Sequence, residues 1–166
     1  MVQTLAIDEQ SIRSLPIGKR LERLNDILKN NNDESVRWDA VWLLGEIAAQ
    51  LNPDDRFFKK VSDMSAYVLR HDDNIIVRHE VCYQIAGRNL REKIPDLAWS
   101  ALNDPSDLVR HEATECLGII HAEDEIETIK KATKDKSKTV RDTAFFVLKR
   151  MKRTNGKEFV PYTTSF

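Results

Sequence analysis

Two histidine–glutamate pairs occupy the same position in two copies of a repeated motif. The pair His79-Glu80 follows a Val-Arg dipeptide, and the pair His111-Glu112 follows the same dipeptide 32 residues later (111 − 79 = 32). Imidazole and carboxylate donors without thiolates favour iron or manganese, or zinc, over a structural zinc site. Two imidazoles and a carboxylate also form the facial triad that holds iron(II) with positions open for oxygen. The paired motifs therefore indicate a metal site.

The motif that carries these side chains recurs four times in helical surroundings. Its valines are 41, 32 and 31 residues apart (77 − 36, 109 − 77 and 140 − 109), at Val36, Val77, Val109 and Val140. Each copy follows an acidic turn and precedes apolar residues at helical spacing. Three of the four copies then carry a glycine, at Gly45, Gly87 and Gly118. A turn, a helix, a glycine and a second amphipathic helix are typical of an α-solenoid.

The sequence thus predicts an all-α fold, an α-solenoid of about four helix pairs over residues 16–153. We expect the first helices of the pairs over about 17–29, 54–69, 91–102 and 124–133. The second helices should begin near Glu34, Asn74, Ser106 and Ser137. Residues 1–15 form an N-terminal arm. The tail, 154–166, shows no helical period and is predicted either to be disordered or to pack on a partner.

Composition narrows the classes of partner. The chain of 166 residues is 41% hydrophobic and 32% charged, with a net charge of −1, which suits one helical domain. Because there is no basic excess for phosphate contacts, we expect no nucleic-acid partner. The apolar runs are too short to span a bilayer and the first ten residues lack a signal-peptide pattern, so we expect no membrane partner. Cys82 and Cys116 fit buried thiols of a reducing compartment, and a cytoplasmic location is predicted.

The arginine of each motif stands close to the acidic turns. A ladder of Arg–Asp contacts between neighbouring repeats would explain this column better than phosphate binding, because every arginine has acidic residues in its own repeat. The sequence therefore predicts a structural role for Arg37, Arg78, Arg110 and Arg141.

Stacked repeats would bring the two histidine–glutamate pairs into one row. Helix axes about 8–10 Å apart make His79 and His111 neighbours, with Glu80 and Glu112 beside them. The same row carries further acidic side chains, at Asp39, Glu115 and Asp142. A metal ion, or a basic group such as an amine or a lysine side chain, would relieve their mutual repulsion. A single pair would be read as an ordinary solvated face, but two pairs in register favour a site.

Residues 61–151 resemble one half of deoxyhypusine hydroxylase, a HEAT-repeat di-iron monooxygenase. The stretches Arg78–Gly87 and Val109–Gly118 carry most of the likeness, and Glu115 followed by Leu117-Gly118 is especially similar to that family's motif. By position, the resemblance implies that His79, His111 and Glu112 are metal ligands. It implies that Glu80 is a further ligand or a catalytic contact to the basic substrate.

The resemblance also implies a homodimer. The family has eight repeats and four histidine–glutamate pairs in one chain, whereas this chain has about four repeats and two pairs. A complete di-iron site would thus need a second copy of the chain, related by a two-fold axis. The function implied is an iron-dependent oxygenase acting on an amine or lysine-like substrate.

A non-catalytic scaffold is the alternative. Short HEAT-repeat proteins that resemble phycobiliprotein lyases would hold a protein partner on the concave face. Trp38 and Trp42, four residues apart, are the candidate anchors of such an interface. They could instead be structural, with Trp42 in the core and Trp38 covering the row beside His79.

Overall fold

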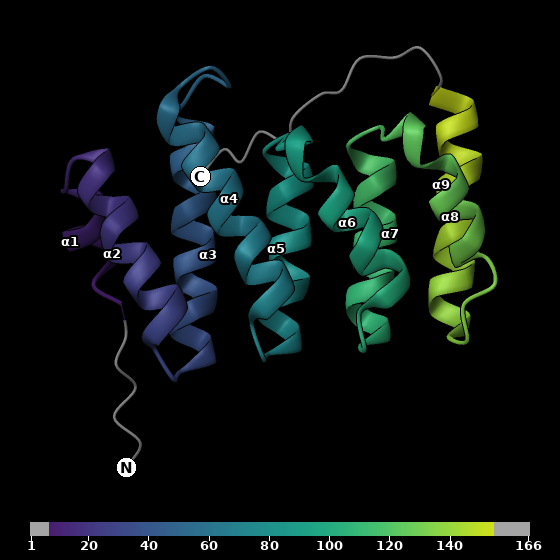
Figure 1. Cartoon of the computed structure of the whole chain (residues 1–166), viewed down its shortest axis with the longest axis horizontal. Helices are drawn as coiled ribbons and strands as arrows, with labels where there is room; N and C mark the ends of the chain where they lie inside the picture. Colours follow the sequence, from purple (N-terminus) through teal and green to yellow (C-terminus); the bar gives the residue numbers. More distant parts are fainter. Residues whose placement is uncertain (1–6, 155–166) are drawn as a thin grey trace.

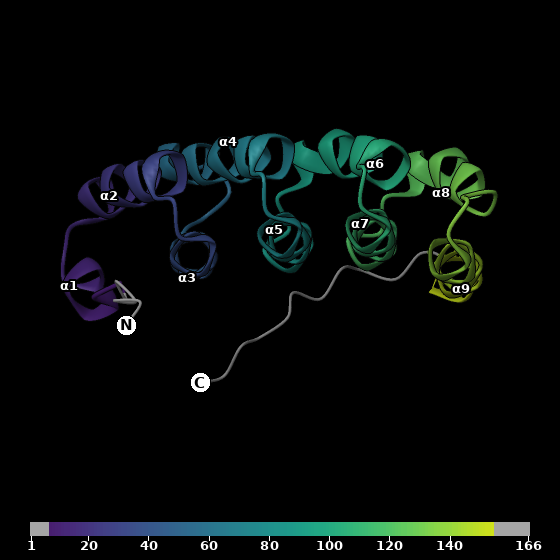
Figure 2. The same ribbon diagram turned by 90° about the horizontal axis from the view of Figure 1, so that it is seen from below.

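The computed structural model describes residues 7–154, which form two layers of helices along one curved stack (Figures 1 and 2). The outer layer consists of α2 (Ile17–Asn30), α4 (Arg56–His71), α6 (Ile94–Asn103) and α8 (Ile126–Ala132). The inner layer consists of α3 (Glu34–Ala49), α5 (Ile75–Gly87), α7 (Asp107–Ile119) and α9 (Lys138–Thr154). Short 3₁₀ turns, η1 (Arg91–Lys93) and η2 (Glu123–Glu125), lead into α6 and α8. The predicted all-α solenoid is therefore confirmed.

Short polar side chains in the turns set where the inner helices begin. The side chain of Asp33 accepts hydrogen bonds from the amides of Ser35 and Val36 at the start of α3. Asn74 does the same for Ile76 and Val77 at the start of α5. These bonds satisfy amide donors that have no partner inside the helix. Each inner helix accordingly starts at its predicted position or one residue after it.

The arginine ladder predicted from the sequence joins each repeat to the next. Three arginines each make two hydrogen bonds to the aspartate of the following turn, in the pairs Arg37–Asp72, Arg78–Asp104 and Arg110–Asp135. Each also donates to a backbone carbonyl six residues earlier, as Arg78 does to Asp72 at 2.8 Å. One guanidinium thus fixes the turn before its own helix and the turn before the next helix.

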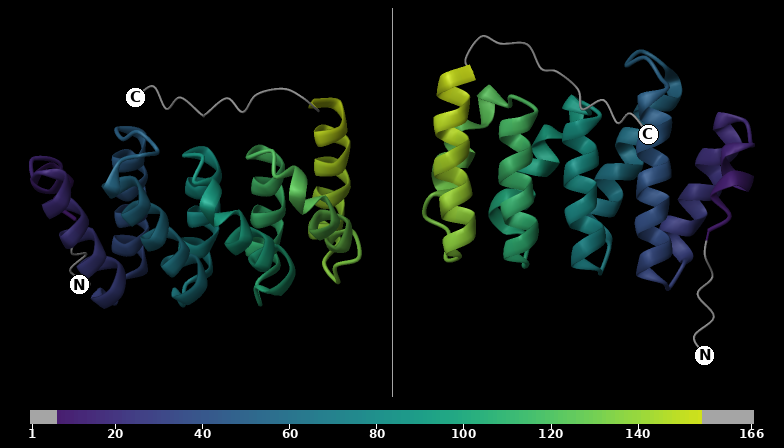
Figure 3. Two further views of the ribbon diagram at one scale, coloured as in Figure 1. Left: turned by 45° about the horizontal axis from the view of Figure 1, so that its top comes forward. Right: turned by 180° about the vertical axis from the view of Figure 1, so that it is seen from behind.

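Glycine lets neighbouring inner helices approach closely where a side chain would collide. A Cβ at Gly118 of α7 would lie 2.6 Å from Cγ1 of Val147 on α9, well inside van der Waals contact. A Cβ at Gly45 of α3 would likewise overlap the side chain of Gln84 on α5. The inner helices therefore run side by side along the stack, as the view from behind shows (Figure 3).

The ends of the chain depart from the predicted outline. The residues predicted as an N-terminal arm contain a short helix, α1 (Glu9–Arg13), which Asp8 begins by accepting a hydrogen bond from the amide of Ser11. At the other end, α9 continues to Thr154, the first residue of the predicted tail, and the remainder of that tail lies outside the described residues. Between residues 7 and 154 no helix combines the length and the apolar character needed to cross a bilayer.

Candidate metal centre

The predicted row of histidines and glutamates forms where α5 and α7 run side by side in the inner layer (Figure 3). Nε2 of His79 on α5 lies 3.1 Å from Oε2 of Glu112 on α7. The Glu112 side chain is only 11% exposed, while that of His79 is 31% exposed. A separation of 33 residues in the chain (112 − 79) thus becomes a direct contact at the edge of the concave face.

His111 extends this contact towards α9. Its Nδ1 lies 2.6 Å from Oγ1 of Thr143, and its Nε2 lies 3.8 Å from Oε2 of Glu115, one helical turn further along α7. Donor atoms of His111, Glu112 and Glu115 all lie within 4.8 Å of one another. Four side chains, those of His79, His111, Glu112 and Glu115, therefore gather at one place.

The electrostatics of the pair favour a charged histidine facing a carboxylate. The hydrogen bond that His79 donates to Glu112 raises the pKa of His79 above its usual value, against the opposing effect of burial. Burial alone would raise the pKa of Glu112, but the hydrogen bond and charge of His79 outweigh it and hold that pKa below the usual value. The Nε2–H of a charged His79 would point to Oε2 of Glu112, which is the place where a cation could bind instead.

Glu80 lies beside this group rather than in it. Its Oε1 accepts a hydrogen bond from Nε2 of Gln84 at 3.0 Å, and Trp38 on α3 also hydrogen-bonds to its carboxylate. Burial raises the pKa of Glu80, which is 9% exposed. The structure thus places His79 against Glu112 and groups His111 with Glu112 and Glu115, and it directs Glu80 towards α3.

The donor set fits a divalent metal ion. Metal–nitrogen and metal–oxygen bonds of about 2.0–2.2 Å place neighbouring donor atoms roughly 3 Å apart. The 3.1 Å between Nε2 of His79 and Oε2 of Glu112 matches that spacing. Thr143 can accept the Nδ1 proton of His111, which would fix the ring and leave Nε2 free to bind a metal. Nitrogen and oxygen donors without thiolate suit iron, manganese or zinc.

Two residues of this group were not identified as ligands or supports from the sequence. The sequence motifs place Glu115 in the acidic row but not in the ligand set, and they do not distinguish Thr143. The spacing of four residues between His111 and Glu115 was the available signal, because such residues share one face of a helix. Thr143 carried no comparable signal, since its contact depends on how α9 lies against α7.

Three further side chains lie apart from the cluster, namely Asp142 of the predicted row and the histidines His71 and His121. Asp142 forms an ion pair with Lys138 one turn earlier on α9, so it does not belong to the acidic group. His71 ends α4 and its ring lies 4.8 Å from the ring of Tyr67, while His121 occupies a turn with a φ of 52°. Both lie outside the cluster. Cys82 and Cys116 are buried free thiols, as predicted.

Known proteins that are similar in sequence include members of the family that the motifs resemble. The deoxyhypusine hydroxylase of Saccharomyces cerevisiae is 30% identical over 141 residues, which cover 82% of this chain and 43% of the relative. That of Candida glabrata is 32% identical over 139 residues, covering 79% and 42%. The chain thus spans about two fifths of the length of these relatives, and the resemblance noted in the sequence is confirmed.

A solved structure shares the fold. Human deoxyhypusine hydroxylase in complex with glycerol superposes with a TM-score of 0.73 at 19% identity, over 90% of this chain and 49% of the human chain. The family described as HEAT repeats matches residues 65–149, which are 85 of the 166 residues (149 − 65 + 1 = 85). Since that match covers more than half of the sequence, the chain belongs to the HEAT-repeat family.

Proposed function

We propose that this protein is an iron-dependent oxygenase similar to deoxyhypusine hydroxylase, which works as a homodimer on an amine or lysine-like side chain. The observation that carries the proposal is the 3.1 Å contact between His79 and Glu112, with His111 and Glu115 beside it. The curated relatives named deoxyhypusine hydroxylase supply the reaction class. A basic substrate, such as the deoxyhypusine in their name, fits the acidic surroundings of the cluster.

The side chains divide the work of such a site between them. His79, His111 and Glu112 would hold the ion, and Glu115 adds a fourth donor. Bound iron would supply the activation of dioxygen that hydroxylation requires. Oε1 of Glu112 lies 3.5 Å from Sγ of Cys116, which leaves Oε2 directed at the site.

Glu80 is the candidate contact for the basic substrate. Gln84 and Trp38 hold its carboxylate next to the cluster, and its burial makes the charged form costly when no cation is near. A substrate ammonium group would stabilise that charge and would be oriented by it. This arrangement gives Glu80 a role in substrate positioning that is separate from the metal ligands.

The length of the relatives supports the proposed homodimer. The chain covers 43% of the yeast enzyme and 49% of the human structure, so two copies approximate one full-length relative. One copy offers a single cluster of ligands among its described residues. A di-iron centre would accordingly need the clusters of two copies to face each other.

Iron content measured by elemental analysis on the size-exclusion peak tests the proposal. We expect about one iron per chain in a dimeric peak, since each chain supplies one set of ligands. His79→Ala and His111→Ala should lose the iron and keep their helical circular dichroism. His71→Ala is the matched control, because His71 is exposed in the outer layer, and it should retain the iron.

Activity is tested separately. The iron-loaded dimer is incubated with dioxygen, a reductant and a protein bearing deoxyhypusine, and mass spectrometry looks for the addition of one oxygen atom. Iron-loaded protein that leaves this substrate unchanged would exclude that substrate. Wild-type protein that takes up no iron under anaerobic conditions would overturn the proposal as a whole.

A non-catalytic scaffold remains the second candidate function. The observation in its favour is a pocket beside Trp38 and Trp42 in the same inner layer, whose lining contains none of His79, His111 and Glu112. In a scaffold, combined substitution of His79 and His111 would weaken partner binding no more than other surface changes do. The iron measurement separates the two functions, because the scaffold requires no metal.

A further inference from the structure

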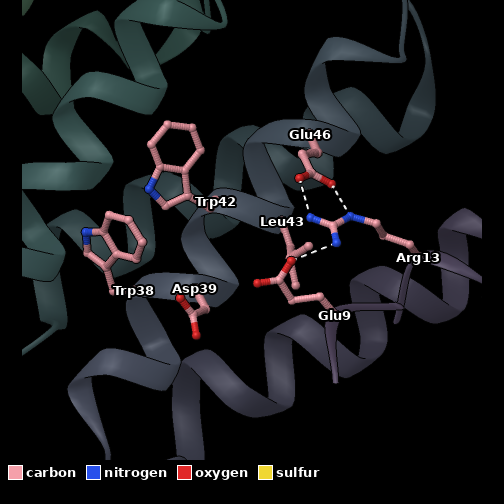
Figure 4. Close-up of a pocket in the computed structure, with 7 residues that line it drawn as sticks. All are labelled: Glu9, Arg13, Trp38, Asp39, Trp42, Leu43 and Glu46. Carbon is pink, nitrogen blue, oxygen red and sulfur yellow. Dashed lines mark hydrogen bonds and ion pairs between the residues drawn. The ribbon is translucent and has the colours of Figure 1, made fainter. Parts of the chain in front are cut away.

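A second concave site lies at the amino-terminal end of the inner layer. α1 and α3 enclose a pocket with a volume of about 530 Å³ (Figure 4). Its walls include two residues of α1 and five of α3, namely Glu9, Arg13, Trp38, Asp39, Trp42, Leu43 and Glu46. None of these residues belongs to the candidate metal ligands.

The pocket holds more negative than positive charge. Arg13 donates two hydrogen bonds to Glu46, at 2.9 and 2.7 Å, and forms a 2.7 Å ion pair with Glu9 (Figure 4). One cation therefore serves two carboxylates. Asp39 is a third carboxylate and forms no ion pair with any lysine or arginine in the described part of the chain. Burial, with the nearby charges of Glu9 and Asp33, raises the pKa of Asp39, as expected where positive charge is lacking.

Two indole rings line the same pocket as this carboxylate. The ring centroids of Trp38 and Trp42 are 5.7 Å apart and the rings are inclined by 55° (Figure 4). The face of an indole attracts a cation, and arginine binds it more often than lysine does. A free carboxylate beside aromatic faces is a combination that recognises a planar guanidinium, which can stack and form paired hydrogen bonds at once.

A second aspartate–tryptophan pair in the same chain already binds an arginine side chain. On α6, Asp96 and Trp99 are three residues apart, like Asp39 and Trp42 on α3. The guanidinium carbon of Arg70, from α4, lies 3.6 Å from the centroid of the Trp99 ring, and its Nε lies 3.9 Å from Asp96. Residues three apart share one face of a helix, so both aspartate–tryptophan pairs can present the same surface. At α3 no cation of the described residues takes the place that Arg70 has at α6.

We propose that the pocket between α1 and α3 binds an arginine side chain of a protein partner, with the guanidinium stacked on Trp42 and paired with Asp39. The stacking of Arg70 on Trp99 is an example, within the same molecule, of the geometry that we propose for the bound arginine. The negative charge of the pocket supplies the electrostatic attraction. The site does not use the metal ligands, so it anchors a basic segment of the partner whether or not the cluster at His79 binds iron.

The experiment titrates metal-free, full-length protein with Nα-acetyl-arginine N-methylamide at constant ionic strength and follows the indole N–H signals by NMR. The chain has three tryptophans and therefore gives three indole N–H signals. Trp99 serves as an internal control because the Arg70 side chain already covers its ring. We expect the signals of Trp38 and Trp42 to shift together and to saturate in the millimolar range, as suits one side chain. The signal of Trp99 should not move.

One control tests whether binding requires the charge of the guanidinium or only its shape. A second control tests whether binding requires Asp39 itself or only the negative charge of the protein. The citrulline analogue has nearly the same shape without the charge and should not bind. Asp39→Asn should weaken binding by about tenfold, because a charge-assisted bond is lost. Asp142→Asn removes an acidic group at the other end of the same layer and should leave binding unchanged. Equal binding of citrulline, equal shifts of all three tryptophans, or full binding by Asp39→Asn would each overturn the proposal.

Discussion

The ion pair between Arg78 and Asp104 allows the stability of the stack to be tested at one bond. The side chains are 8% and 2% exposed, and Nε and Nη2 of Arg78 donate to Asp104 at 2.9 and 3.0 Å. Asp104→Asn keeps the shape of the side chain but removes its charge and turns an amide group towards the guanidinium. Breaking a buried pair by removing one partner costs about 3–5 kcal/mol.

The expected cost of Asp104→Asn lies near the lower limit of that range. Arg78 keeps its hydrogen bonds to the carbonyls of Asp72 and Asp73, so its charge is not left without any acceptor. We therefore expect a loss of about 3 kcal/mol in the free energy of unfolding, a large part of the stability of a domain of this size. Asp73→Asn is the matched control, because that side chain pairs with Arg37 but is 90% exposed, and it should cost at most about 1 kcal/mol.

Urea unfolding of metal-free protein, followed by circular dichroism at constant pH, measures both variants. The pair also fixes the position of α5 against α7, since Arg78 precedes His79 and Asp104 precedes the start of α7. Asp104→Asn should therefore weaken iron binding as well as stability. A loss below 1 kcal/mol for Asp104→Asn, or equal losses for the two variants, would refute the view that the buried ladder sets the register.

Three further results are expected. Gly118→Ala should destabilise the fold by about 1–3 kcal/mol in urea unfolding, because its Cβ would lie 2.6 Å from Val147, and Val147→Ala in the same chain should recover much of the loss. In metal-free protein the raised pKa of His79 contributes stability that is complete below about pH 6.5 and lost as pH rises through the folded-state value. The lowered pKa of Glu112 contributes stability present above about pH 4.5 and lost as pH falls, so His79→Gln should flatten the pH dependence of unfolding in both regions. Thr143→Val should weaken iron binding by about tenfold relative to Thr143→Ser, in a competition titration with a chelator, because only the hydroxyl can accept the imidazole proton.

The repeated motif made most of the fold predictable. Four copies of Val-Arg after acidic turns set the starts of the inner helices, and the recurring arginines implied contacts between repeats that the structure shows. Local periodicity could not reveal α1, whose five residues depend on Asp8 as a cap and on the contact of Arg13 with Glu46 across 33 residues. Long-range contacts of single side chains leave no trace in a local pattern.

The candidate site was predictable as a row but not as a set of contacts. Equal positions in adjacent repeats placed His79 near His111, yet the shortest contact joins His79 to Glu112. A prediction from equal positions assumes that the helices lie in register, whereas side-chain direction along each helix decides which atoms meet. Glu80 illustrates the difference, because it lies next to His79 in sequence and turns towards α3 instead.

A diagonal rule explains which residues meet in the row. The residue two positions after the valine of one repeat contacts the residue three positions after the valine of the next. Three contacts follow this rule along the stack: Trp38 with Glu80, His79 with Glu112, and His111 with Thr143. Two adjacent histidine–glutamate pairs therefore create one histidine–glutamate contact between repeats, not two.

The diagonal rule also determines what the two unmatched members of the pairs can do. Glu80 meets an indole, so its carboxylate is left for a cation other than a neighbouring histidine. His111 meets a hydroxyl, so one ring nitrogen is held while the other points to Glu115. The repeats on either side thus differ from the middle ones at the positions where a longer histidine–glutamate row would continue. Among residues 7–154 the row therefore offers one group of donors, and the proposed di-iron centre would take its remaining ligands from a second copy of the chain.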